Sequence, residues 1–187
     1  MEGAYSIKTG IQSVSFSNQQ GIDCAREYGN YGCAGGKPDR AFDYYKDHWI
    51  NTEHDYPYSG YYGYLKGVCG YDETRGLTKV IDYVNIPTES PEAIKEYLKL
   101  GPVAAALSSA QTPFKFYESG VITSHECALK LDHAILIVGH GIENGHEYFL
   151  VKNSWGADWG LDGYVKVGIS SGPGYCGLNI DPSQPYV

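Results

Sequence analysis

The sequence lacks long apolar runs, basic stripes, internal repeats and low-complexity linkers. No apolar stretch reaches the roughly 18 residues that a membrane-spanning helix needs, so no membrane span is expected. The 14 basic residues form no cluster and face 22 acidic ones, for a formal net charge of −8 at pH 7. This balance argues against nucleic acid as a partner. With 42% hydrophobic residues among 187, the composition indicates a globular chain with a core.

The start of the chain carries no recognisable signal peptide. Met1-Glu2-Gly3 has neither a basic segment nor an apolar core behind it. If Met1 is the native start, we expect a cytoplasmic protein whose cysteines stay reduced. If the chain is a truncated product, a lysosomal or secreted location is expected instead.

The histidines show no spacing that is typical of a metal site. The group His125-Glu126-Cys127 comes nearest, but it lacks a second pair of ligands. We therefore expect no metal and no cofactor.

The stretch 131–160 holds two strand-length runs rich in β-branched and aromatic residues. The first run, HAILIVG, begins at His133, and the second, EYFLVK, ends just before Asn153. The intervening GIENG predicts a hairpin. His133 is therefore expected at the head of one strand and Asn153 at the foot of its antiparallel neighbour.

Such a pair suits thiol-based acyl transfer. An imidazole takes the proton of a cysteine, and a side-chain amide oxygen accepts from the other ring nitrogen and fixes the tautomer. His133 is the candidate base and Asn153 the candidate orienter. Trp155 is expected to cover their hydrogen bond, which is stronger where water is excluded.

Local signals predict further elements. Ser17 and Gln20 form a capping box that starts a short helix, which Gly21 weakens by up to about 1 kcal/mol. Ser90 with Pro91 starts another helix, and residues 103–107 read as a buried strand. A helix is expected to begin at Pro38 and to bury Ala41, Phe42, Tyr45 and Trp49 on one face. The core is expected to continue with Phe114, Phe116 and Tyr117.

Six segments, in order along the chain, carry a resemblance to one protein family. They are SNQQGIDC at 17–24, YGCAGG at 31–36, YPY at 56–58, GPV at 101–103, KNSWG at 152–156 and WGLDGYVKV at 159–167. On these motifs the chain resembles the papain-like cysteine peptidases, and within them the cathepsin L-like branch.

The resemblance covers the whole chain and implies an α+β papain-like fold. Residues 1–187 would form one unit, with a mostly helical half over about 1–95 and a β-rich half over about 96–187. The resemblance also implies a set of substrate contacts: Gly35, Gly36, Lys37, Pro38, Asp132 and Trp155. Lys37 and Pro38 stand where the branch has apolar residues, so an altered selectivity is expected.

The family's nucleophile is not found in this sequence. It lies in a CGSCW segment, with the histidine roughly 130–150 residues downstream. No cysteine precedes Cys24, so the chain is expected to begin after both that cysteine and the oxyanion-hole glutamine. The resemblance pairs Cys24 with Cys69 and Cys127 with Cys176. It leaves Cys33 as a free thiol, since its family partner lies in the absent segment.

These features favour an inactive pseudopeptidase that acts as a binding or structural component of an assembly, with a peptide or protein partner. A second chain or larger assembly is expected to fill the groove where the family's central helix would lie. The alternative is the C-terminal part of an active cysteine endopeptidase, whose nucleophile-bearing segment is missing or supplied by another chain. A weaker third possibility is a carbohydrate- or peptide-binding module using the tyrosine-rich loop 56–71.

Overall fold

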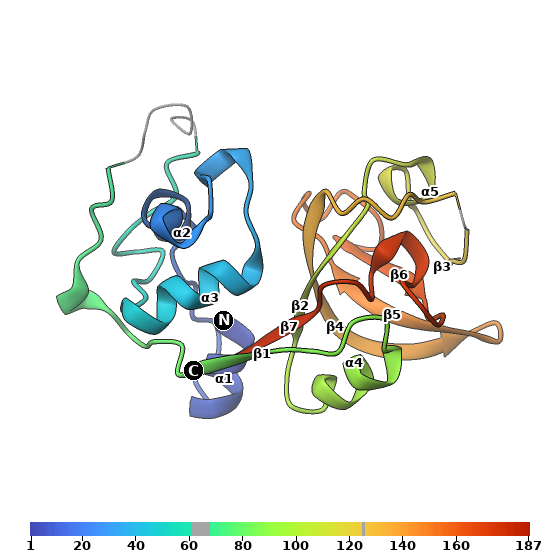
Figure 1. The fold of residues 1–187 in the computed structure, drawn as a ribbon, viewed down its shortest axis with the longest axis horizontal. Coiled ribbons are helices and arrows are strands. Elements are labelled where there is room, and N and C mark those ends of the chain that lie inside the picture. Colours follow the sequence, from blue (N-terminus) through green and yellow to red (C-terminus); the bar gives the residue numbers. More distant parts are fainter. Residues whose placement is uncertain (61–67, 125) are drawn as a thin grey trace. The chain divides into compact units, whose positions relative to one another are not determined.

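The computed structural model of the chain combines helices with a seven-stranded sheet, so the α+β class is confirmed (Figure 1). The structure describes residues 1–60, 68–124 and 126–187. It divides into two compact units: Met1–Val84 with Pro185–Val187, and Asn85–Gln184. The division was expected near residue 95, whereas the second unit already includes the helix that begins at Pro91.

The first unit is mostly helical. Its elements are α1 (Glu2–Thr9), α2 (Asn18–Cys24), η1 (Ala25–Tyr28), η2 (Gly32–Ala34), α3 (Pro38–Asp47) and η4 (Glu73–Arg75), followed by most of β1 (Asp82–Asn85). Its core is aromatic: Tyr44 and Tyr45 of α3 are buried, with ring centroids 4.9 Å apart. Edge-on aromatic pairs of this kind add about 0.5–1.5 kcal/mol to the burial of their area.

Helix α2 begins at the predicted cap. The Ser17 hydroxyl accepts a hydrogen bond from Gln20 N at 3.0 Å. Gly21 stands in this helix for a reason that the sequence does not show: a Cβ there would lie 3.2 Å from the hydroxyl oxygen of Tyr45. The glycine makes room for a buried tyrosine of the neighbouring helix.

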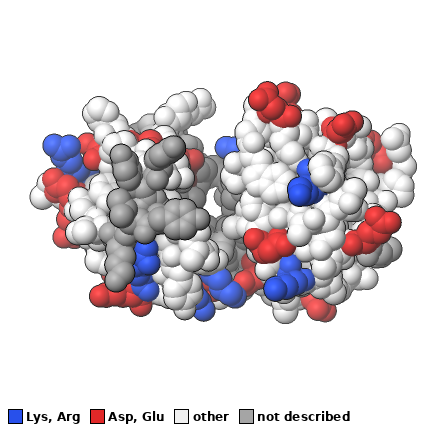
Figure 2. All heavy atoms as spheres, turned by 90° about the horizontal axis from the view of Figure 1, so that it is seen from above, with Lys and Arg blue, Asp and Glu red and all other residues white. Residues whose placement is uncertain are grey.

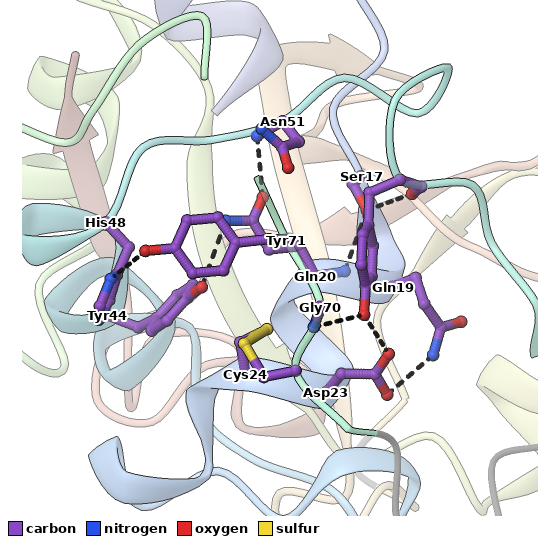
Figure 3. Close-up of a disulfide and its surroundings, with 12 residues drawn as sticks. Ser17, Gln19, Gln20, Asp23, Cys24, Tyr44, His48, Asn51, Gly70 and Tyr71 are labelled. Atoms are coloured by element: carbon purple, nitrogen blue, oxygen red, sulfur yellow. Dashed lines mark hydrogen bonds between the residues drawn. A yellow bond between two sulfur atoms is a disulfide. The ribbon is translucent and has the colours of Figure 1, made fainter. Parts of the chain in front are cut away.

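A buried glutamine joins α2 to the segment after α3. Gln20 is fully buried and uses both ends of its amide. Its Nε2 donates to Trp49 O at 2.8 Å and to Tyr44 Oη at 3.2 Å, and its Oε1 accepts from Asn51 N at 2.8 Å. Figure 3 shows the bonds of Gln20 to Tyr44 and Asn51 beside the disulfide of Cys24. Because every polar atom is paired, the amide can be buried without a desolvation penalty.

The second unit holds most of the seven-stranded sheet together with the short helices α4 and α5 and the 3₁₀ turn η5. Its elements are α4 (Pro91–Leu98), β2 (Val103–Leu107), α5 (Thr112–Lys115), β3 (Val121–Ile122), β4 (His133–Glu143), β5 (His146–Lys152), β6 (Tyr164–Gly168), η5 (Tyr175–Gly177) and the start of β7 (Ser183–Tyr186). The strand order is β1-β7-β2-β4-β5-β6-β3. Neighbours β2, β4, β5 and β6 pair antiparallel, while β3 runs parallel to β6.

Alternate residues of the central strands point into the core of the second unit. Ile137 on β4 and Val151 on β5 are opposite each other and fully buried, as is Val103 opposite Ile137 on β2. Each such side chain stabilises the fold by about 1.5–3 kcal/mol. Because side chains alternate along a strand, this burial also fixes the register that sets His133 opposite Leu107.

Two sequence predictions about the core are wrong. Trp49 lies beyond the end of α3 and is 39% exposed, since the helix stops at Asp47 and the chain turns into an extended segment. Phe116 is 68% exposed because it follows the last residue of the short helix α5, whereas Phe114 and Tyr117 are buried. Of the tyrosine-rich loop 56–71, residues 61–67 lie outside the described part of the chain.

Acidic and basic side chains are interspersed on the face drawn in Figure 2, and no continuous basic patch is visible there among the described residues. None of the helices in the described ranges is long and apolar enough to cross a membrane.

The Gln20 network yields a prediction about stability. Gln20→Ala leaves the buried Asn51 N and the partly buried Trp49 O without their partner and opens a cavity, so the free energy of unfolding should fall by about 2–4 kcal/mol. Urea unfolding followed by circular dichroism measures this. The control is Asn18→Ala, an exposed position in the same helix, which should change the free energy by less than about 0.5 kcal/mol. Equal stability of the two variants would contradict this role.

Candidate active site

The hairpin β4–β5 places the two candidate catalytic side chains. His133 is the first residue of β4, and Asn153 follows the last residue of β5. The antiparallel register sets Leu136 opposite Lys152, so the head of one strand and the foot of the other are neighbours. The connection is tight because Asn144 and Gly145 both have positive φ, at 50° and 82°, the geometry of a two-residue hairpin turn.

A short hydrogen bond joins the two side chains. His133 Nε2 lies 2.7 Å from Asn153 Oδ1, which also accepts from Ser154 N at 2.8 Å. An amide oxygen only accepts, so Nε2 of the neutral imidazole carries the proton. The other ring nitrogen, Nδ1, is left as the basic atom.

The rest of the Asn153 amide is buried without a partner. Asn153 is 8% exposed, and its Nδ2 has no hydrogen bond among the described residues. The amide cannot be flipped, because the backbone N–H of Ser154 would then face the amide nitrogen, which does not accept. Unpaired buried donors are rare and costly. Here the orientation that serves His133 leaves the opposite end of the amide unpaired.

Aromatic rings pack beside the hydrogen-bonded pair. The Trp155 ring centroid lies 5.0 Å from that of His133, with the planes 38° apart. Phe114, fully buried on α5, packs edge-on against Trp155 at 5.5 Å and against His133 at 6.1 Å. Trp159 lies 5.1 Å from Phe114. These rings lower the local polarity around the imidazole, where a hydrogen bond is stronger than in water.

Of these rings, only Trp155 is predicted from the sequence as part of the site. Phe114 is predicted as a core residue, and Trp159 appears only within a family motif. The spacing of Trp155 and Trp159 is the one feature of the sequence that could have linked Trp159 to the site. No local sequence pattern predicts that α5 packs against these two rings. Their meeting depends on the long connection between β2 and β4.

Asp132 supports the loop next to His133. Its Oδ1 accepts from Ser109 N at 2.7 Å and from Ser109 Oγ at 3.0 Å, and its backbone N–H donates to Leu107 O at 3.1 Å. The carboxylate thus ties the segment after β2 to the residue before the imidazole. The contact with substrate that the resemblance implied for Asp132 remains a proposal.

The other implied substrate contacts lie in the first unit, in a glycine turn before α3. Gly35 has φ 109°, a conformation that favours glycine, and Gly36 follows it. Lys37 is the N-cap of α3 and Pro38 its first residue. Lys37 is exposed, while Pro38 is partly buried.

The structure contains two disulfides, in the pairs that the resemblance implied. Cys24 joins Cys69 with Cα atoms 4.8 Å apart, and Cys127 joins Cys176 with Cα atoms 4.6 Å apart. Cys33 is an exposed free thiol on η2. A hollow of about 430 Å³ opens beside the Cys127–Cys176 bond, and neither His133 nor Asn153 lines it.

Within the described ranges, no group of three or more histidine, cysteine, aspartate and glutamate side chains could hold a metal ion. His125, the first member of the group considered from the sequence, lies outside those ranges.

The shielding of the His133–Asn153 hydrogen bond by Trp155 can be tested by hydrogen exchange. Trp155→Ala should expose the His133–Asn153 bond and speed solvent exchange of the Nε2 proton at least about tenfold, the factor that corresponds to roughly 1.4 kcal/mol. NMR of the labelled imidazole measures the rate. Trp49→Ala is the matched control, because Trp49 and Trp155 are similarly exposed, at 39% and 41%. Equal exchange rates in both variants would contradict the claim that Trp155 shields this hydrogen bond from water.

Comparison with known proteins assigns this geometry to a family. The family model described as "Papain family cysteine protease" matches residues 1–186. The chain is 41% identical to the oryzain gamma chain of Oryza sativa subsp. japonica, covering all of this chain and 51% of that protein. It is 36% identical to procathepsin L of Rattus norvegicus, covering all of this chain and 56% of that protein. The chain thus spans about half the length of the curated relatives it matches.

Solved structures show the same fold. The digestive procathepsin L 3 of Tenebrio molitor superposes with a TM-score of 0.90 at 34% identity, over all of this chain and 60% of that one. Bromelain of Ananas comosus, solved with the inhibitor E64, superposes with a TM-score of 0.85 at 33% identity, over all of this chain and 84% of that one. The expectation of a papain-like fold is confirmed.

Proposed function

This chain belongs to the papain family of cysteine proteases, and we propose that it supplies the base-bearing part of a thiol peptidase site. His133 is the base and Asn153 is the amide that orients it. The supporting observation is the 2.7 Å contact between His133 Nε2 and Asn153 Oδ1, made beside Trp155. That contact leaves Nδ1 available to take a proton.

The chemistry follows from that nitrogen. A cysteine outside these 187 residues transfers its thiol proton to His133 Nδ1, and the thiolate attacks the carbonyl carbon of a peptide bond. The carbon–nitrogen bond breaks, and the imidazolium returns its proton to the leaving amine. A water then attacks the thioester while His133 accepts one of its protons. The carboxylic acid leaves, and the thiolate and imidazolium are restored. Asn153 holds the ring in place through each transfer.

We propose further that the 187 residues alone do not cleave peptides. Cys24, Cys69, Cys127 and Cys176 are all held in disulfides. Cys33 is an exposed free thiol on η2 of the first unit, and no hydrogen bond among the described residues pairs it with a base that could take its proton. A cysteine-directed covalent peptide inhibitor should therefore fail to label the purified chain.

A binding role without catalysis, as one component of an assembly, is the second candidate. It is favoured by apolar side chains in and after α1: Tyr5 is the buried residue of this helix, while Ile7 and Ile11 are 62% and 50% exposed. Burial of such side chains by another polypeptide would stabilise the chain. The partner that fits is a protein segment with an apolar face.

Fusion separates the two candidates. A cysteine-bearing segment taken from a matched relative, the oryzain gamma chain of rice, is joined to the chain at Met1, upstream of α1. We expect the fused protein to cleave a blocked peptide amide in a thiol-dependent reaction. His133→Ala in the same protein should lower kcat/KM by about 10²–10⁴, the usual contribution of a general base.

His146→Ala is the control, since His146 lies at the exposed tip of the β4–β5 hairpin, and it should leave kcat/KM unchanged. A folded fusion that cleaves nothing would overturn the catalytic proposal and leave the binding role. Cleavage by the 187 residues alone, or inhibitor labelling at Cys33, would overturn the claim that the chain is inactive by itself.

A further inference from the structure

The glycine turn of the first unit presents one residue with unused backbone groups. Gly35 is engaged on both sides: its C=O accepts from Tyr31 N at 2.8 Å and its N–H donates to Gly32 O at 3.2 Å. Gly36 is exposed, and its N–H and C=O make no hydrogen bond within the described part of the chain. An extended peptide can pair with such an open donor and acceptor on one residue.

One buried side chain holds this residue from behind. Asn30 is 7% exposed, and its Oδ1 accepts from Lys37 N at 2.8 Å. A Cβ on Gly36 would lie 2.2 Å from Asn30 Oδ1 and 2.7 Å from its Cγ. The amide of Asn30 is therefore packed closely against Gly36 Cα.

This contact explains why a glycine stands at position 36. Gly35 has φ 109°, whereas Gly36 is not among the residues of positive φ. The φ angle at Gly36 therefore does not require glycine, and the space that a side chain needs is taken by Asn30. Asn30 and Gly36 thus form a matched pair.

Asn30 is itself anchored at its backbone. Its N–H donates to Ala25 O at 3.3 Å, at the start of η1. The preceding carbonyl, Gly29 O, accepts from Arg40 Nη1 of α3 at 2.7 Å. The backbone that carries the Asn30 side chain is therefore held by η1 and by α3.

We infer that Asn30 is a positioning residue for peptide binding: through Lys37 N it fixes Gly36 so that the unused N–H and C=O can pair with an extended peptide backbone. This rests on the proposed function, which makes a peptide the substrate. A loop that is already ordered loses less conformational freedom when a peptide binds, so losing the clamp lowers affinity.

The test is a titration of the full 187-residue chain, labelled with ¹⁵N-glycine, with a blocked tripeptide amide. In the wild-type chain the Gly36 amide resonance should shift saturably. Asn30→Ala should raise the Kd about tenfold or more. Asn30→Asp, whose carboxylate can still accept from Lys37 N, should stay within about threefold of the wild type.

Two further variants keep the result interpretable. Asn18→Ala, at an exposed asparagine of the same unit, should bind as the wild type does. Asn30→Gln, which moves the amide oxygen by one methylene group, should lose affinity as Asn30→Ala does, and it serves if the alanine variant does not fold. The unfolding temperature of each variant is measured alongside, because a merely structural role would lower it without changing the Kd of the folded chain.

The inference is overturned if the folded Asn30→Ala and Asn30→Gln variants keep the wild-type Kd, or if Gly36 does not respond to the peptide. These outcomes are separate from those of the fusion experiment, because binding at Gly36 requires neither a thiol nor His133. An inactive fusion with Asn30-dependent binding would defeat the proposed catalysis alone. An active fusion whose KM is unchanged by Asn30→Ala would defeat this inference alone.

Discussion

The candidate site depends on one hydrogen bond, between His133 Nε2 and Asn153 Oδ1. An imidazole alone is free to change tautomer and to rotate, and either change would move its basic nitrogen. The amide oxygen prevents both, since it offers only an acceptor and is itself held by Ser154 N. The hairpin β4–β5 brings His133 and Asn153 within hydrogen-bonding distance. The strand register, which the buried core residues set, directs the two side chains toward each other. The position of the proposed base is thus set by the packing of core residues some distance from it.

Both units use buried amides to fix a backbone or a ring. Gln20 joins α2 to the segment after α3, Asn30 closes the glycine turn, and Asn153 orients His133. An amide suits such positions because it bonds in defined directions and carries no charge, so burial costs less than for a carboxylate. The cost is visible at Asn153, whose Nδ2 is buried without a partner among the described residues. The contacts of Oδ1 with His133 and Ser154 decide the orientation of that amide.

The parts of the fold that local patterns determine could be predicted from the sequence. The cap at Ser17, the strand that starts at His133 and the hairpin before Asn153 all depend on neighbouring residues. The parts that depend on distant contacts could not. The packing of Phe114 on His133 and the clamp of Asn30 on Gly36 leave no periodic signal. Trp49 was misplaced because the helix pattern continues past the residue where the chain turns away.

The central claim, that Asn153 holds His133 in one tautomer with Nδ1 as the base, is tested most directly by ¹⁵N NMR of the labelled imidazole. At a pH where the ring is neutral, the account predicts that Nε2 carries the proton and Nδ1 does not. It also predicts that Asn153→Ala allows both tautomers. A wild-type ring protonated on Nδ1, or a tautomer unchanged by Asn153→Ala, would contradict it.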